Sequence, residues 1–489
     1  MKFFISNGEF YGILNFCKNK NILVSRGDPA LKIAHIQKWN VEKIRFLDIE
    51  DDNKNNKKRK EKTEENENEE KQGETIKETE TLKRTELIVF MKRKRIQPKP
   101  EHLKWDELPE HEFSTENLYF WDGNIRNDIN LKLRIKGFKI FGGHPLCHFL
   151  EYDRVVAKQY FEKLNIPTPP YEVAFSVDEA ITILNKISFE QAVLKPSADI
   201  SSITTLIAPP QELASFLEEN RVIFEKANNF IIEEFKEGVE ISCERYKWGN
   251  NIGFFNFTIE AKKFLAGNLG VNTGSEFNIV FGYDLIEKFA SYTKNKRRTI
   301  EILENLCEEL AKTQDLDCEI LDINFIIDPL KQEYYALEFS PRIGYLGTLT
   351  WAKILKDENI YWDFIPDYLE ENFTPPTSRF GFGIRITIPP YPYKNPLINS
   401  KDIVVEINTF EEEKDGIKVE VSPEGIEYDE EENCFYSTEE NLCSVHSTSE
   451  KLEDLFETTY NFIKENIDAP ALQYRVDAEA YYVEYLKKL

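Results

Sequence analysis

The sequence of 489 residues contains no apolar run approaching the roughly 18 residues that a membrane-spanning helix needs. Its first residues, MKFFISNGEFYG, lack the apolar stretch of a secretory signal. Seven cysteines occur without a CxxC pair or a Cys/His cluster, which argues against disulfides and structural zinc and favours reduced thiols. We therefore expect a cytoplasmic protein with no membrane partner.

The sequence also lacks an excess of positive charge, because its formal net charge is -25. Duplex binding depends on Lys and Arg side chains that neutralise phosphates, so a nucleic acid polymer is disfavoured as a partner. A small phosphorylated ligand is not excluded, since its site needs only a few local donors. Hydrophobic residues make up 41% of the chain, which is ample for a folded core.

The order of patterns along the chain predicts four regions. Residues 51–86 carry almost no apolar side chains and dense charges of both signs, so we expect a solvated, disordered insertion. It interrupts an N-terminal region, 1–145, in which strand-like and helix-like stretches alternate, the pattern of a parallel α/β sheet. Residues 146–228 and 229–374 are each typical of an α+β lobe, and 375–489 of a β-rich capping domain.

Several residues around two predicted strands could contact a nucleotide. Lys195 ends the apolar strand QAVLK, where its ammonium group suits a phosphate. Glu233 and Glu234 end the strand NFIIEE, and Glu240 begins the next strand. Glu234 and the backbone through Phe235 could face an adenine, and Glu240 could accept hydrogen bonds from ribose hydroxyls. Any one of these residues alone is more simply explained as solvent-exposed, so the prediction depends on the combination.

A second group of residues suits a magnesium ion and a transferring phosphate. Glu338 and Ser340 share one face of the strand LEFS by its period of two, and Arg342 follows. Glu338 would hold the ion, and Arg342 would contact the phosphate as a catalytic residue. Asp322 and Asn324 share one face of the strand LDINFII and are candidate further ligands. A half-exposed strand pair explains these two residues equally well.

The stretch GNLGVNTGSE predicts a glycine-bearing turn with Asn272, Thr273 and Gly274 at its centre. Such a turn could present backbone amides to an anionic substrate. Lys262, just upstream, adds a positive charge that we expect to be catalytic, although solvent exposure is the usual place for a lysine.

Taken in order, VLKPSAD, IIEEFKEGVEIS, GVNTGSE and EFSPRIG resemble the glycinamide ribonucleotide synthetase family, the phosphoribosylamine-glycine ligases, within the ATP-grasp superfamily. DRVVAKQYFEKLNIPTPPY is similar to the family's helix and its IPT segment, and GFGIRITIPPYP and QYRVDA are similar to parts of its C-terminal domain. The resemblance covers most of residues 130–478. It implies an ATP-grasp core of two α+β lobes, flanked by an N-terminal parallel α/β domain and a β-rich C-terminal domain.

The resemblance further implies ATP with Mg²⁺ or Mn²⁺, and two small-molecule substrates, a carboxylate such as glycine and an amine, joined through an acyl phosphate. The roles it carries over are nucleotide binding by Lys195, Glu234 and Glu240, magnesium binding by Glu338, and contacts around phosphate and substrate by Asn272, Thr273 and Arg342.

Three departures from the family leave alternatives open. The family's N-terminal GGREHA element has no counterpart in MKFFISNGEFYG, the glycine-rich loop after the phosphate lysine is replaced by PSADISSIT, and Ser340 stands in place of a metal-binding asparagine. One alternative is a ligase that joins an amino acid to another acceptor, such as a modified nucleotide or a peptide. The other is a catalytically degraded ATP-binding sensor or interaction protein.

Overall fold

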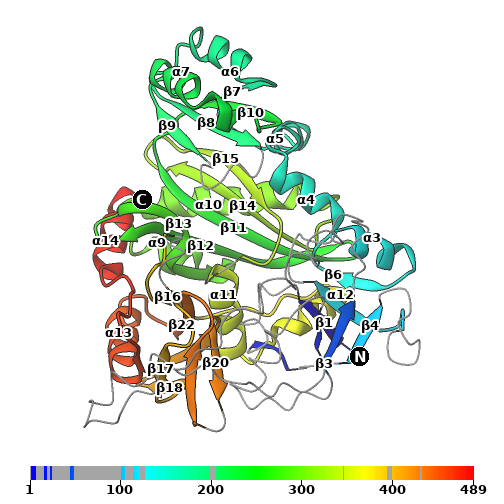
Figure 1. Ribbon diagram of the computed structural model, residues 1–489, viewed down its shortest axis with the longest axis vertical. Coiled ribbons are helices and arrows are strands. Elements are labelled where there is room, and N and C mark those ends of the chain that lie inside the picture. Colours follow the sequence, from blue (N-terminus) through cyan, green and yellow to red (C-terminus); the bar gives the residue numbers. More distant parts are fainter. Residues whose placement is uncertain are drawn as a thin grey trace, which may run out of the picture.

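The computed structural model describes residues 2–6, 16–18, 22–24, 44–48, 101–104, 114–121, 127–197, 205–344, 346–393, 399–429 and 432–489. The charged segment 51–86 lies outside the described residues, as do 198–204, which include most of the PSADISSIT segment. Figure 1 shows one lobe at the top of the molecule, a long central sheet below it, and the N-terminal and C-terminal strands at the other end.

The N-terminal strands form the predicted parallel sheet. Its order is β4(Glu101–Lys104)-β3(Ile44–Asp48)-β2(Ile22–Val24)-β1(Lys2–Ser6)-β5(Leu118–Trp121)-β6(Lys139–Phe141), with α3 (Asn127–Ile135) between its last two strands. All five strand pairs are parallel. The strand order reverses beside β1, and in open α/β sheets such a reversal opens a crevice at the carboxyl ends of the strands.

The lobe at the top of Figure 1 is an α+β lobe whose sheet includes β10, so the predicted boundary at residue 228 falls inside one hydrogen-bonded sheet and is wrong. Its antiparallel sheet has the order β7(Tyr171–Ala174)-β10(Asn229–Glu234)-β8(Ala192–Ser197)-β9(Leu206–Ala208), and its helices are α5 (Arg154–Lys163), α6 (Val177–Leu184), α7 (Pro210–Glu219) and α8 (Arg221–Phe224). Asp153 begins α5 by accepting hydrogen bonds from two backbone amides of its first turn. Every residue of β8 is buried, as its apolar sequence requires.

The central sheet has nine antiparallel strands. Their order is β15(Glu333–Ser340)-β14(Ile320–Asp328)-β11(Val239–Trp248)-β12(Asn251–Leu265)-β13(Leu269–Gly282)-β16(Phe380–Thr387)-β22(Asn441–Ser449)-β19(Ile417–Pro423)-β18(Glu411–Lys414). The division that the sequence suggests at residue 375 therefore falls inside one hydrogen-bonded sheet, since β13 pairs with β16.

Helices cover both faces of this sheet. One face packs in an apolar core with α9 (Ile286–Ala290), α10 (Lys296–Ala311), α13 (Leu455–Asn466) and α14 (Ala478–Lys488). The other packs on α11 (Leu346–Asp357) and α12 (Ile365–Glu370), with the short helices η3 (Tyr283–Leu285) and η4 (Trp362–Phe364) nearby. The remaining elements are α4 (Pro145–Tyr152) and a small sheet, β20(Ile426–Asp429)-β21(Cys434–Ser437)-β17(Val404–Ile407)-β23(Ile467–Asp468). Among the described residues, no helix is long and apolar enough to cross a membrane.

Candidate functional site

Polar side chains gather on one face of the central sheet because side chains alternate between faces along each strand. Ser242 of β11 lies opposite Thr258 of β12 and Asn324 of β14, and Glu244 lies opposite Asn256 and Asp322. The residues that alternate with them along β11, Ile241 and Cys243, point into the apolar core on the other face. The sheet thus presents a polar floor toward the first lobe and α11.

The four predicted metal ligands lie together on this floor. Asp322 pairs with Ser340 and Asn324 with Glu338 across β14 and β15, so all four share one face. The Asn324 Nδ2 atom lies 3.3 Å from Glu338 Oε1, and Asp322 Oδ1 accepts a hydrogen bond from Ser242. Carboxylate and amide oxygens are the ligands that Mg²⁺ prefers, and rotation of the Asn324 amide would turn its oxygen toward an ion beside Glu338. The donor set therefore fits such an ion.

The described residues contain no group of three or more His, Cys, Asp or Glu side chains that could hold a metal by themselves. An ion at Glu338 would therefore need further oxygen ligands from a bound phosphate, which is how Mg²⁺ is commonly held in nucleotide sites.

Cations surround Glu338. Arg154 Nη1 of α5 lies 3.1 Å from Glu338 Oε2. Burial would raise the pKa of the Glu338 carboxyl, but the positive charges of Arg154, Lys195 and Lys262 outweigh it and lower the pKa to about 2. Glu338 is therefore ionised at neutral pH, as a metal ligand must be.

Lys195 of β8 lies where the first lobe meets β15 of the central sheet. Its Nζ atom lies 2.7 Å from Glu233 Oε2 and 3.5 Å from the carbonyl oxygen of Leu337. Lys158 of α5 forms a second ion pair with Glu233. Glu233, with 1% of its side chain exposed, is thus the shared counter-ion of two buried lysines.

Sequence reasoning missed Arg154 and Lys158. The signal was present, since two basic residues four apart lie on the same side of a helix, here α5 directly before the lobe. Burial lowers the pKa of Lys158 to about 8, although the Glu233 carboxylate opposes the shift.

The residues predicted to face adenine lie at the end of β10. Glu234 forms an ion pair of 2.7 Å with Lys236. The Phe235 amide donates to the Gln191 carbonyl over 3.1 Å, so in this structure its N–H is directed to the backbone of the same lobe rather than outward. The Phe235 side chain is partly exposed.

Glu240 lies apart from these residues and beside Lys262, with which it forms an ion pair. Lys262 also lies 4.0 Å from Glu260. Burial would lower the pKa of Lys262, but the carboxylates of Glu240, Glu260 and Glu338 raise it above its usual range. Lys262 is therefore a fixed cation at neutral pH. Arg342 pairs with Glu151 of α4, with 2.6 Å between Nε and Oε1.

The predicted turn around Asn272, Thr273 and Gly274 is wrong. These residues lie within β13, and the chain reverses earlier, at Gly267 and Asn268, which both have positive φ angles. A glycine followed by an asparagine can adopt the left-handed backbone of a β-hairpin turn, so the reversal of the chain does not need Gly274. Thr273 Oγ1 still approaches the predicted cation, donating to the Lys262 carbonyl over 3.0 Å.

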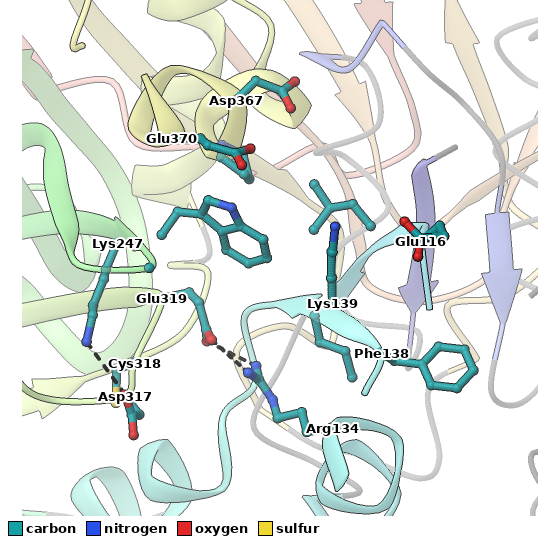
Figure 2. A pocket seen from close by; sticks show the side chains of 15 residues that line it. Glu116, Arg134, Phe138, Lys139, Lys247, Asp317, Cys318, Glu319, Asp367 and Glu370 are labelled. Carbon is teal, nitrogen blue, oxygen red and sulfur yellow. Dashed lines mark hydrogen bonds and ion pairs between the residues drawn. The ribbon is translucent and has the colours of Figure 1, made fainter. Parts of the chain in front are cut away.

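A cavity of 570 Å³ lies elsewhere, between the N-terminal sheet, the β11–β12 turn and α12 (Figure 2). Arg134 and Glu319 form an ion pair on its wall, and Trp248 also lines it. None of the predicted site residues lines this cavity. A much smaller hollow is lined by Arg154, Lys158, Lys195 and Glu338. We assign the candidate site to this smaller hollow, because a site for phosphate and metal needs several charged side chains close together more than it needs apolar volume.

Comparison with known proteins shows what the chain resembles. Residues 153–348 match the ATP-grasp (A) domain of phosphoribosylglycinamide synthetase. A phosphoribosylamine–glycine ligase of Fusobacterium nucleatum is 24% identical over 359 residues, which are 72% of this chain and 80% of that protein. The enzyme of the same name from Clostridium acetobutylicum is 27% identical over 220 residues, 43% of this chain and 49% of that protein.

Solved structures share the fold over nearly the whole chain. The phosphoribosylamine–glycine ligase of Thermotoga maritima superposes with a TM-score of 0.62 at 15% identity, covering 97% of this chain and 99% of the other. The phosphoribosylglycinamide synthetase of Anaerococcus prevotii gives 0.55 at 14% identity, covering 96% and 98%. In sequence and fold the chain thus resembles the phosphoribosylamine–glycine ligases, and its residues 153–348 match the ATP-grasp domain of phosphoribosylglycinamide synthetase.

Proposed function

We propose that this chain uses ATP and Mg²⁺ to activate a small carboxylate, which is then joined to an amine. The observation that carries the proposal is the convergence of Lys158 and Lys195 with Arg154, Glu338 and Asn324 at the junction of the two lobes. Three cations there suit a triphosphate, and the carboxylate–amide pair suits the ion that accompanies it. Mn²⁺ has the same ligand preferences and is a second candidate.

Each residue has a role in this proposal. Lys195, Lys158 and Arg154 would bind the phosphates, and Glu338 with Asn324 would hold the metal, which neutralises charge that develops on the transferring phosphate. Asp322 and Ser340, the next pair along β14 and β15, would be further ligands of the metal. Glu234 and Phe235 at the end of β10 would lie beside the base, as their place in the first lobe suggests.

The reaction has two steps. A carboxylate oxygen of the first substrate attacks the γ-phosphorus of ATP, the bond to the β-phosphate oxygen breaks, and ADP leaves. The amine then attacks the acyl carbon, the acyl–oxygen bond breaks, and phosphate leaves while the nitrogen loses a proton. Lys262 and Arg342 carry fixed positive charge that would stabilise the negative charge developing on the acyl phosphate.

Glycine and phosphoribosylamine are the substrates that the relatives' name suggests for this chain, and they head the panel for the test. ADP release should be measured with Mg²⁺ over a panel of amino acids, with phosphoribosylamine and simple amines as acceptors, for the native chain and Lys195→Ala. Release that depends on one acid and one amine, and that disappears in the variant, supports the proposal. Absence of both ATP binding and ADP release for every pair contradicts it.

The replacement of the family's asparagine by Ser340 favours one second candidate, an ATP-binding sensor without turnover. Ser340 offers a weaker metal ligand than an amide oxygen, and it lies opposite Asp322 rather than at Asn324. ATP binding without ADP release, together with a Glu338→Ala variant that keeps its cellular function, would favour the sensor.

A further inference from the structure

The ion pair between Arg154 and Glu338 crosses the candidate site. Arg154 is the first residue of helix α5 in the first lobe, and Glu338 lies near the end of β15 in the central sheet. The Arg154 Nη1 atom lies 3.1 Å from Glu338 Oε2, and both side chains are partly exposed. A residue that would bind phosphate is therefore paired with the residue that would bind the metal.

Both oxygens of the Glu338 carboxylate accept from nitrogen donors in this structure. Arg154 contacts Oε2, and the Asn324 Nδ2 atom lies 3.3 Å from Oε1. Mg²⁺ binds carboxylate oxygens at about 2.0–2.1 Å and needs its other ligands close around it. A metal cation cannot take this position beside Oε2 while the positively charged guanidinium group occupies it. The metal and Arg154 thus compete for one carboxylate.

The space around this pair is also too small for the proposed ligand. The hollow lined by Arg154, Lys158, Lys195 and Glu338 has a volume of about 10 Å³, which is room for roughly one water molecule. A triphosphate with its metal is many times larger. A nucleotide can therefore enter only if contacts across the hollow separate.

The Arg154 pair is the contact best suited to separate. Lys158 and Lys195 pair with Glu233, and all three residues lie in the first lobe with almost wholly buried side chains. Breaking those pairs would leave buried charges without partners, which costs much more than breaking a partly exposed pair. The Arg154 pair joins the first lobe to the central sheet, so its two partners can part while the lysine pairs stay intact.

Resting on the proposed function, we propose that Arg154 is a switch that makes metal binding at Glu338 depend on the nucleotide. Without a nucleotide, the guanidinium group occupies Glu338 and excludes the metal. When a nucleoside triphosphate enters, the guanidinium group transfers to the phosphates, for which its planar donors are well suited, and Glu338 becomes free for the metal. Neither state leaves a charge without a partner.

The test measures binding of Mn²⁺ to the nucleotide-free chain by electron paramagnetic resonance, in which bound Mn²⁺ loses the sharp signal of the free ion. Arg154→Met should bind Mn²⁺ at least about 10-fold more tightly than the native chain, an ordinary size for coupling between two ligands. Arg154→Lys keeps the charge and should stay close to the native affinity. Adding Glu338→Gln to Arg154→Met should remove the gain, which separates this site from acidic side chains on the surface.

Arg221→Met is the matched control. Arg221 lies on α8 of the same lobe and pairs with Asp178 and Glu218, neither of which belongs to the proposed site. Its loss also frees carboxylates, so it shows how far Mn²⁺ binding rises when any arginine pair is broken. A nonhydrolysable ATP analogue should tighten Mn²⁺ binding at least about 10-fold in the native chain, and by a smaller factor in Arg154→Met, where Glu338 is already free.

Three outcomes would overturn the inference. One is that the nucleotide-free native chain binds Mn²⁺ as tightly as Arg154→Met does, and another is that the gain persists when Glu338→Gln is added. The third is an equal gain in Arg221→Met. Calorimetric titration of the native chain with the ATP analogue separates these results from failure of the ligase proposal, since binding of the analogue leaves that proposal intact, whereas its absence contradicts both.

Discussion

Asn324 and Glu338 face each other across strands β14 and β15, with 3.3 Å between the Asn324 Nδ2 and Glu338 Oε1 atoms. Arg154 holds the other oxygen of the same carboxylate at 3.1 Å. Glu338 thus connects a helix of the first lobe with two strands of the central sheet, which places its charge where the lobes meet. This arrangement makes it the residue whose loss should affect metal-dependent chemistry most.

The first prediction is that Glu338→Gln reduces Mg²⁺-dependent ADP release by at least about 100-fold, the usual effect of removing a group that stabilises transferred charge. Glutamine keeps the size of the side chain but cannot neutralise a metal ion. Magnesium titration of ADP release measures the effect. Glu333→Gln is the control, since Glu333 is exposed at the far end of the same strand, and equal loss in both variants would contradict the assignment.

The second prediction concerns Glu233, which lies between Lys158 and Lys195. Glu233→Gln leaves two buried ammonium groups without their counter-ion, so the free energy of unfolding should fall by about 3–5 kcal/mol. Urea denaturation at neutral pH measures the change. Glu234→Gln, next in sequence and in a partly exposed pair with Lys236, should change it by at most about 1 kcal/mol. A small effect of both variants would show that Glu233 is not a buried counter-ion.

Local patterns predicted which of the candidate residues share a strand face. The period of two placed Glu338 with Ser340 and Asp322 with Asn324 on shared strand faces, and both pairs occupy the same floor in the structure. The resemblance to the ligase family and the parallel N-terminal sheet are also confirmed. These features depend on residues close in sequence, or on motifs whose order is preserved.

What the sequence could not predict depends on which strands lie side by side. The role of Glu233 as a counter-ion depends on α5, and sequence spacing says nothing of that contact. The turn was misplaced because two glycine-containing stretches lie close together and only the backbone angles show which one reverses the chain.

The third prediction is a pH dependence. The pKa of Lys158 is lowered to about 8 from 10.5, so this side chain loses its proton above pH 8 in the folded protein. Nucleotide affinity should therefore fall as the pH rises through 8, because one phosphate-binding cation is lost. Fluorescence titration with a nucleotide measures this affinity from about pH 6.5 to about pH 9.5, roughly 1.5 units either side of that pKa.

The control is Lys158→Arg, which stays charged throughout this range and should abolish the fall in nucleotide affinity.

The stability of the folded chain should change in the opposite direction. Between pH 8 and 10.5 the unfolded chain binds more protons at this residue than the folded chain, so this lysine's contribution to stability rises with pH there. An identical decline of nucleotide affinity in native and variant chains would exclude Lys158 as its cause.

The fourth prediction concerns the ion pair in Figure 2 that joins the N-terminal region to the central sheet. Arg134 of α3 contacts Glu319 through two bonds, Nη1 to Oε1 at 2.8 Å and Nη2 to Oε2 at 3.1 Å. Glu319→Gln should lower the free energy of unfolding by about 1.5–3 kcal/mol, the range for hydrogen bonds to charged groups. Asp317→Asn, which alters an exposed carboxylate near Lys247, should change it by at most about 1 kcal/mol.

The form of the unfolding curve gives this experiment a second readout. Arg134 also donates to Asn130 Oδ1 and to the Gly142 carbonyl, both within the N-terminal region, and Glu319→Gln leaves these bonds in place. If the pair couples the two regions, the variant should unfold in two steps, with the N-terminal region first, where the native chain unfolds in one. A single transition shifted by the same amount in Glu319→Gln and Asp317→Asn would mean that the pair contributes nothing to holding the regions together.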